Sequence, residues 1–215
     1  TVDPLPTVTL GAISALCAGS DAITLTQGSP AGGTYFGTGV TGTSFNPATA
    51  GAGTVQIGYS FTDGSGCTDT AFRNVTVHPQ PSVSLGALTA VCVDAGSFAL
   101  SGGSPAGGTY AGTGVTGGNF SPSTAGVGTW PITYTFTDGN ACTDSATQNQ
   151  VVDSLPTVTF AAISNLCANA GPITLNQGSP AGGTYSGTGV TGNSFNPATS
   201  GVGTFTLTYS FTDGN

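Results

Sequence analysis

Cysteine is the residue type of this chain with the clearest covalent chemistry, and its spacing is regular. Cys17 and Cys67 are 50 residues apart, and so are Cys92 and Cys142. We therefore expect the disulfides Cys17–Cys67 and Cys92–Cys142, one inside each domain. The partner of Cys167 would fall at position 217, outside the 215 residues of the chain. Paired cysteines indicate an oxidising compartment, whereas a metal site would need histidine or a second cysteine pair nearby.

The side chains that usually perform acid–base catalysis are nearly absent. His78 is the only histidine and stands beside Pro79 in a linker-like stretch, and the chain contains neither Glu nor Lys. General acid–base chemistry at neutral pH usually needs His, Glu, Lys or a tuned Asp. We therefore predict that the chain is not an enzyme and that it needs no cofactor.

Aspartate is the only acidic residue type, and its pairs raise the question of calcium. Asp63 and Asp69 flank one expected hairpin, and Asp138 and Asp144 flank the equivalent one. Calcium takes about six to eight oxygen ligands, so two carboxylates at each hairpin are few. We predict no metal site and keep calcium as the alternative.

Three tyrosines recur at equal spacing and have two interpretations. Tyr35, Tyr110 and Tyr185 each follow a Gly-Gly-Thr sequence. As an exposed ladder of rings they could stack on sugars and contact a carbohydrate ligand. Alternatively, they pack in the core with their hydroxyl groups at its rim, which suits an aromatic side chain with one polar end. The glycines before each tyrosine favour the second interpretation.

The composition predicts a β-protein and excludes nucleic-acid binding. Only 5% of residues are charged, the net charge is −8, and Arg73 is the only basic residue besides the histidine. One cation cannot neutralise a phosphate backbone. Without Lys, Glu and Met most strong helix formers are missing, while Thr, Val, Gly and Ser favour strands and turns.

An exact internal repeat of 75 residues organises the whole chain. The sequence SPAGGTY begins at Ser29, Ser104 and Ser179, and Tyr-x-Phe-Thr-Asp-Gly follows thirty residues after each start. Around the latter motif apolar residues alternate with polar ones, as in a half-buried antiparallel strand. Further strands are expected at residues 7–10, 22–27, 34–36 and 40–45, and from Cys67 through Val77. About six or seven short strands in each repeat predict a small β-sandwich.

The repeat phase also predicts the domain boundaries. Residues 1–4 match the end of a repeat, so we expect them to be the tail of a preceding unit. Residues 5–79 and 80–154 are then two complete domains, and residues 155–215 form a third that stops before its last strand. No transmembrane run is present, so we expect no membrane contact in this part of the protein.

The repeat sequence resembles a known family of surface repeats. The pattern Cys…SPAGGTYSGTGVTG…FNPATAGVGT…YTFTDGNACTD, present with small variations in all three repeats, is similar to the immunoglobulin-like repeats of very large Bacteroidetes surface proteins. The resemblance implies an all-β tandem array of small immunoglobulin-like β-sandwich domains. It also implies an extracellular, cell-surface location, export by the type IX system, and a role in adhesins, gliding-motility filaments or stalks.

The same resemblance extends to a short modification sequence. Asp-Ser/Thr followed by a small apolar residue is similar to the O-glycosylation sequence of Bacteroidetes. It occurs at three places, whose acceptors would be Thr70, Ser145 and Ser154. The alternative is chance, since Ser and Thr are abundant throughout the chain.

The sequence is compatible with three functional hypotheses. The first is a set of structural shaft repeats of an extracellular adhesive or filament-forming surface protein, in which each repeat contacts its neighbours in the same chain. The alternative is a carbohydrate-binding module array of a secreted polysaccharide-degrading protein. A third hypothesis is a fibre in which copies of the chain pack laterally. The expected partners are neighbouring repeats, surface glycans or lateral copies, and neither nucleic acid nor membrane.

Overall fold

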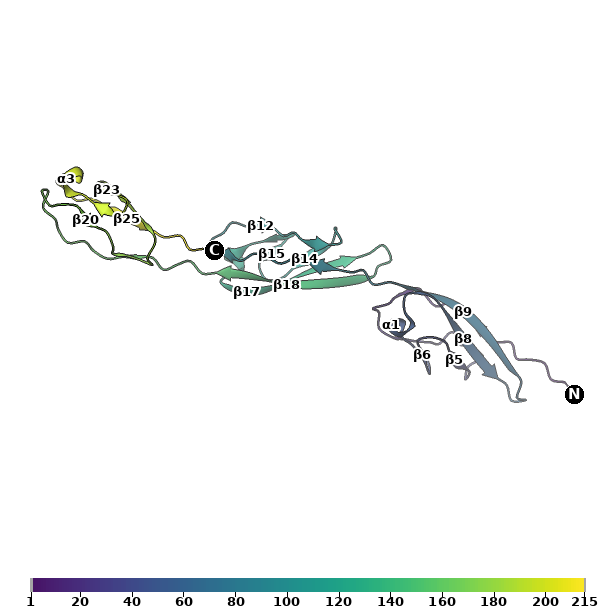
Figure 1. The fold of residues 1–215 in the computed structure, drawn as a ribbon. Coiled ribbons are helices and arrows are strands. Elements are labelled where there is room, and N and C mark those ends of the chain that lie inside the picture. Colours follow the sequence, from purple (N-terminus) through teal and green to yellow (C-terminus); the bar gives the residue numbers. More distant parts are fainter. Residues whose placement is uncertain (1, 215) are drawn as a thin grey trace. The chain divides into compact units, whose positions relative to one another are not determined.

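The structure, a computed structural model, describes residues 2–214 and is built almost entirely of short β-strands (Figure 1). The first repeat contains β1 (Thr9–Leu10), β2 (Leu16–Cys17), β3 (Ile23–Thr24), β4 (Gly28–Ser29), β5 (Thr34–Phe36), β6 (Val40–Thr41), β7 (Ser44–Phe45), α1 (Pro47–Ala50), β8 (Gly53–Thr62) and β9 (Thr68–His78). The second contains β10 (Ser84–Leu85), β11 (Val91–Cys92), β12 (Phe98–Ala99), β13 (Gly103–Ser104), β14 (Thr109–Ala111), β15 (Val115–Thr116), β16 (Asn119–Phe120), α2 (Pro122–Ala125), β17 (Gly128–Thr137) and β18 (Thr143–Asp153). The third contains β19 (Thr159–Phe160), β20 (Ile173–Thr174), β21 (Gly178–Ser179), β22 (Thr184–Gly187), β23 (Val190–Thr191), β24 (Ser194–Phe195), α3 (Pro197–Ser200) and β25 (Leu207–Ser210).

The strand order is that of an immunoglobulin-like sandwich. In the first repeat one sheet has the order β2-β9-β8-β5, and β3-β7-β6 together with β1-β4 forms the other side. Only residues 25–27 separate β3 from β4, so these two are successive parts of one stretch of chain. The first sheet then contains the C, F and G strands of an immunoglobulin domain and the second contains A, B, E and D. The expected all-β, immunoglobulin-like fold is confirmed.

The second repeat uses the same strand order, and each sheet draws its strands from a single repeat. Its larger sheet is β11-β18-β17-β14 and its smaller ones are β12-β16-β15 and β10-β13. The described part of the third repeat has β19-β21, β20-β24-β23 and a two-stranded sheet β22-β25. The long strand that follows the hairpin turn in the first two repeats therefore has no counterpart among these residues.

The core of the first repeat lies under its long hairpin. β8 and β9 pair from Gly53–Val77 to Thr62–Thr68 without a break, and their inward side chains include Ile57, Tyr59, Val75 and Val77. Phe45 of β7 and Leu25 cover this face from the other sheet and are almost fully buried. Alternation of apolar and polar residues, which predicted this strand pair, is what places one side of it inside.

Each repeat also contains one turn of helix that the sequence analysis missed. α1 begins at Pro47, and the side chain of Asn46 accepts hydrogen bonds from the backbone N–H groups of Ala48 and Thr49. Asn at the N-cap followed by Pro at the first helical position is a recognised helix start. α3 begins in the same way after Asn196.

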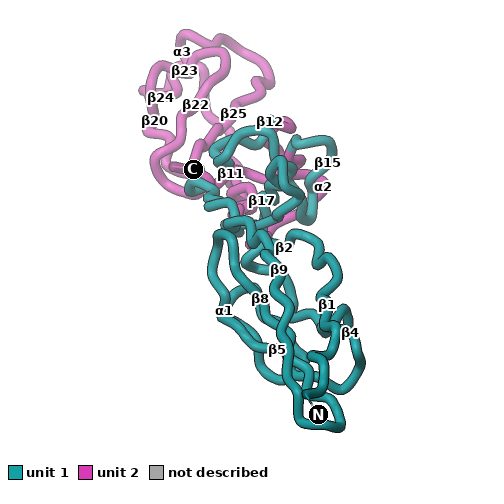
Figure 2. The backbone as a smooth tube through the Cα atoms, turned by 90° about the vertical axis from the view of Figure 1, so that its right-hand side faces the viewer, with its two compact units in different colours: residues 1–87, 99–119, 131–149 teal, residues 88–98, 120–130, 150–215 magenta. Residues whose placement is uncertain are grey.

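The chain divides into two compact units (Figure 2). The first comprises residues 1–87, 99–119 and 131–149, and the second comprises residues 88–98, 120–130 and 150–215. The limits of these units fall inside the second repeat, and the boundaries proposed from the repeat phase stay a prediction. Of the helices in the described part of the chain, all are single turns, and none could span a membrane.

Candidate functional site: the disulfide junction

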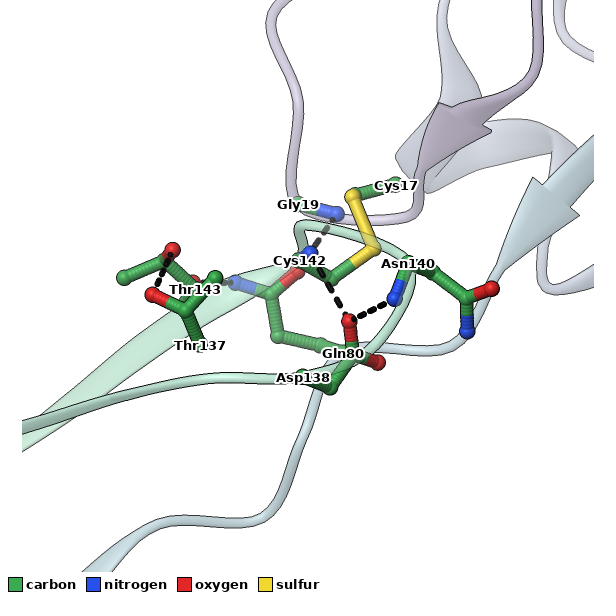
Figure 3. Close-up of a disulfide and its surroundings, with 8 residues drawn as sticks. All are labelled: Cys17, Gly19, Gln80, Thr137, Asp138, Asn140, Cys142 and Thr143. Atoms are coloured by element: carbon green, nitrogen blue, oxygen red, sulfur yellow. Dashed lines mark hydrogen bonds between the residues drawn. A yellow bond between two sulfur atoms is a disulfide. The ribbon is translucent and has the colours of Figure 1, made fainter. Parts of the chain in front are cut away.

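The disulfide of the structure links the first repeat to the second. Cys17 is bonded to Cys142 across a sequence separation of 125 residues, with the two Cα atoms 5.5 Å apart (Figure 3). The expected pairs Cys17–Cys67 and Cys92–Cys142 are therefore wrong. Cys67 and Cys92 have free thiols, and so does Cys167.

The geometry of β9 explains why a bond within the repeat cannot form. Cys17 lies at the end of β2 and is opposite His78, the last residue of β9. Cys67 directly precedes Thr68, the first residue of the same strand. A strand rises about 3.3 Å per residue, so the two cysteines are roughly 35 Å apart. A disulfide needs its Cα atoms within about 7 Å of each other.

A rigid turn presents Cys142 at the tip of the β17–β18 hairpin. The Oδ1 atom of Asp138 accepts hydrogen bonds from the backbone N–H groups of Asn140 and Cys142, at 2.8 and 2.9 Å. The Asp138 N–H donates to the Cys142 carbonyl, also at 2.9 Å. This carboxylate therefore fixes the turn from inside. Asp63 organises the equivalent turn before Cys67 in the same way.

Local interactions hold the pKa of Asp138 below its ordinary value. The hydrogen bond from the Cys142 backbone is the largest cause, followed by the bonds from Asn140, and the charge of His78 acts in the same direction. The ionised carboxylate is thus the form that suits the turn, because hydrogen bonds to the charged form favour it.

Gln80 makes a second bridge beside the disulfide. Its Oε1 atom accepts from the Gly19 backbone N–H at 3.0 Å, and its Nε2 group donates to the Thr143 carbonyl at 2.6 Å (Figure 3). Gly19 lies two residues after Cys17 and Thr143 lies directly after Cys142, so one amide spans both sides of the covalent link. The corresponding residue of the next repeat is Leu155, which cannot make these bonds. Sequence reasoning missed Gln80 because nothing in its linker context marks it.

Among the free cysteines, Cys92 repeats the position of Cys17. Val91 and Cys92 pair in parallel with the end of β18, just as Leu16 and Cys17 pair with the end of β9. Partial burial raises the pKa of the Cys92 thiol, and the negative charges of Asp213, Asp94 and Asp153 raise it further. Cys92 is thus partly buried among carboxylates, whereas Cys167 is exposed.

The recurring tyrosines form interlocked pairs at the core of each repeat. Tyr35 of β5 lies opposite Tyr59 of β8 with ring centroids 4.6 Å apart, and its hydroxyl accepts from the Gly28 N–H at 2.7 Å. The same pairing occurs between Tyr110 and Tyr134 at 4.7 Å. It occurs again between Tyr185 and Tyr209 at 4.6 Å. Tyr35 is buried and Tyr110 and Tyr185 are half-buried, which favours packing over an exposed sugar-binding ladder.

One exposed aromatic pair was not anticipated. Phe36 and Phe72 meet edge to face on β5 and β9 with ring centroids 5.9 Å apart, and each residue remains about half exposed. The ring of Phe36 lies over Gly58, where an added Cβ would come within 2.2 Å of it. The second repeat has Ala111 and Thr147 at these positions, so this pair is particular to the first repeat. A comparison of repeats for their differences would have found it.

The three glycosylation acceptors lie on or next to the second strand of the hairpins. Ser145 is exposed on β18 and Ser154 is exposed directly after it, whereas Thr70 of β9 is half-buried. Glycosylation at these residues stays a prediction. Within residues 2–214 no group of three or more His, Cys, Asp or Glu side chains is close enough to hold a metal ion.

Comparison with known proteins adds little beyond this geometry. No family model matches the chain, and no curated protein is significantly similar to it. One similar solved structure is the insect immune protein hemolin, whose domain arrangement has implications for homophilic adhesion; it is 13% identical, with a TM-score of 0.31 over 68% of this chain and 46% of that chain. Another is a Ca²⁺-stabilized adhesin that helps an Antarctic bacterium reach out and bind ice; it is 20% identical, with a TM-score of 0.36 over 89% of this chain and 62% of that chain. The chain thus spans less than two thirds of either.

Proposed function

We propose that these repeats are shaft units of an extracellular, adhesive or filament-forming surface protein. The observation that supports the proposal best is the Cys17–Cys142 bond, because it ties one repeat to the next instead of closing a single domain. A linkage between successive repeats serves a protein whose task is to transmit load along the chain. Such a bond forms and persists outside the reducing cytosol.

The low charge of the chain and the paired tyrosines in the core of each repeat fit the same role. A shaft needs units that stay folded without ligand. Each repeat has its own tyrosine pair, and the first two repeats also have a hairpin anchored by an aspartate. Neighbouring repeats of the same chain are then the principal partners. The resemblance to Bacteroidetes surface repeats supports export by the type IX system and a place in an adhesin or gliding filament.

The location is tested by labelling intact cells of the source organism. Antibodies raised against the oxidised chain should label the outside of unpermeabilised cells in electron micrographs. Labelling that requires permeabilisation would contradict the proposal. The state of the thiols gives an independent check. Material from the cell surface should contain the Cys17–Cys142 disulfide, and fully reduced cysteines there would contradict the proposal that this bond transmits load between repeats.

The carbohydrate-binding alternative is favoured by one observation, the exposed Phe36–Phe72 pair. Two apolar rings on a sheet face could stack on a sugar, although they occur in one repeat and face each other edge to face. A glycan array probed with the oxidised chain and with Phe72→Ala decides this alternative. Binding that is lost in Phe72→Ala supports a sugar site on the first repeat, and no binding by either protein excludes it.

A further inference from the structure

The outer edge of β25 is unpaired in the part of the third repeat that the structure describes. β25 pairs with β22 alone, whereas β8 lies between β5 and β9, and β17 between β14 and β18. A strand edge offers a row of backbone N–H and C=O groups to any strand that can align with it. In the first repeat the equivalent edge is filled along its whole length by β9.

A groove with both polar and apolar lining residues adjoins this edge. It has a volume of about 350 Å³, and its apolar lining includes Ile163, Leu166, Phe195, Phe205 and Leu207. The residues at the same places in the first repeat belong to or pack against a core that also contains Val75 and Val77 of β9, which are each 1% exposed. Phe45 and Ile57 are fully buried there, while their counterparts in the third repeat, Phe195 and Leu207, retain some exposure. The groove therefore exposes part of the apolar side chains whose counterparts in the first repeat are covered by a core that includes β9.

Cys92 stands in the backbone setting in which Cys17 forms its disulfide. The backbone N–H of the residue after each cysteine donates to the carbonyl of the last residue of the long strand in the same repeat, from Ala18 to His78 at 2.8 Å and from Val93 to Asp153 at 2.9 Å. Both cysteine carbonyls accept at 3.0 Å from a backbone N–H three residues later. The free thiol of Cys92 is thus presented by the same local structure as the bonded sulfur of Cys17.

Asp213 indicates which segment would carry a cysteine to Cys92. Asp213 occupies the place in its repeat that Asp138 occupies in the second, at the start of the turn that carries Cys142 to Cys17. Burial is the main cause of the raised pKa of the Cys92 thiol, and the negative charge of Asp213 is the second cause. In the equivalent junction the turn that begins at Asp138 brings Cys142, four residues later, to Cys17, so a cysteine four residues after Asp213 is the counterpart expected to reach Cys92.

We propose that the edge of β25 and its groove bind an added β-strand of the same type as β9 and β18, and that the cysteine opening that strand forms a disulfide with Cys92. Backbone hydrogen bonds would supply affinity and alternate apolar side chains in the groove would supply specificity, as in other cases of strand addition. The inference does not rest on the proposed shaft role, so either can fail without the other.

The covalent step requires an oxidant, and a small disulfide such as oxidised glutathione is sufficient. One cysteine thiolate attacks the small disulfide, forms a mixed disulfide and releases one small thiol. The second cysteine thiolate then attacks the protein sulfur of the mixed disulfide and releases the other. Two protein thiols thus become one protein disulfide, and the small disulfide becomes two thiols.

The test extends the chain after Asn215 with the sequence of residues 141–153, so that a cysteine follows Asn215 at the same distance as Cys142 follows Asn140. After oxidation in a glutathione buffer, non-reducing peptide mapping should find the added cysteine joined mainly to Cys92. Hydrogen exchange should show new protection of residues 207–210. A bond to Cys167, in the same repeat as the added strand, would overturn the assignment of Cys92.

Two matched variants separate strand binding from the disulfide. With the added cysteine replaced by Ser, protection of residues 207–210 should remain; its loss would overturn the strand site. With Cys92→Ser, the strand should still dock while the cross-link to the second repeat disappears.

If the extended chain fails to fold, a synthetic peptide of residues 141–153 is added to the present chain. It should modify Cys92 faster than a scrambled peptide does, and equal rates would contradict the proposal.

Discussion

The hydroxyl of Tyr134 shows how a repeated loop is fixed by a single side chain. It accepts from the Gly108 N–H at 2.7 Å and donates to the Pro105 carbonyl at 2.5 Å, so the SPAGG sequence wraps around the ring edge. Gly103 and Gly108 are required because the ring leaves no space for a Cβ atom at either position. The motif that revealed the repeat is thus a packing motif, and its tyrosine and glycine positions are explained by contacts in the core.

We expect Gly108→Ala to destabilise the second repeat. The new Cβ would lie 2.4 Å from the Thr135 carbonyl oxygen and 2.5 Å from Tyr134 Cζ, and backbone cannot move aside cheaply. Overpacking of this kind costs about 1–3 kcal/mol. Trp130, the only tryptophan, reports unfolding of this repeat by its fluorescence in urea. The control is Gly139→Ala, where no atom lies within 4 Å of the new Cβ; equal destabilisation by both substitutions would contradict the steric explanation.

Cys92 should react slowly with alkylating agents at neutral pH. Burial and the charges of Asp213, Asp94 and Asp153 raise its pKa, so less of it is the reactive thiolate. Timed iodoacetamide labelling with mass spectrometry should find exposed Cys167 modified first, and the difference should narrow as the pH rises above about 9, where more of Cys92 ionises. Faster labelling of Cys92 than of Cys167 at neutral pH would rule out this explanation.

At the scale of elements, the long hairpin decides which cysteines can meet. In the first repeat the β2 cysteine lies at one end of β9 and the hairpin cysteine at the other, and β18 separates Cys92 from Cys142 in the same way. A short parallel pairing and an aspartate-anchored turn then orient the two sulfur atoms that bond. Gln80 adds a polar bridge at the same place, and its two hydrogen bonds connect Gly19, two residues after Cys17, with Thr143, directly after Cys142.

Replacing Gln80 by the residue found at the equivalent position, Gln80→Leu, should make the disulfide easier to reduce. Both hydrogen bonds lie at the surface, so their combined loss is worth about 1 kcal/mol, which is about fivefold in the equilibrium with glutathione. The measurement is the oxidised fraction of Cys17–Cys142 across a series of glutathione redox buffers. Gln148→Leu, an exposed substitution on β18, is the matched control. If both variants show the same oxidised fraction as the unchanged chain, the Gln80 bridge does not stabilise the disulfide.

At the scale of the whole molecule, periodicity is both the best predictor and the source of the main error. Alternation around Tyr59 predicted β8, and the strand expected at residues 34–36 is β5 as the structure has it. β2 was not predicted, because Leu16 and Cys17 lie in an apolar run from Ala15 to Ala18 that shows no alternation. The 75-residue period makes Cys67 and Cys142 equivalent, so the sequence could not distinguish a bond within a repeat from a bond to the next. Only the length of β9, which separates Cys17 from Cys67, decides between them.

Mechanical unfolding distinguishes the two disulfide arrangements by length. When the chain is pulled from its ends, the segment closed by Cys17–Cys142 cannot extend, and its separation of 125 residues corresponds to roughly 440 Å of extended chain. Two bonds within the repeats, each closing 50 residues, would hide roughly 350 Å instead. We expect single-molecule force spectroscopy to find the larger difference in final contour length between the reduced and the oxidised chain.

Cys17→Ser should abolish this difference in contour length, whereas the double variant Cys67→Ser, Cys92→Ser should preserve it, because those thiols are free. A difference that disappears in the double variant would mean that these two cysteines carry the bonds, and the junction between repeats would then lose its covalent basis.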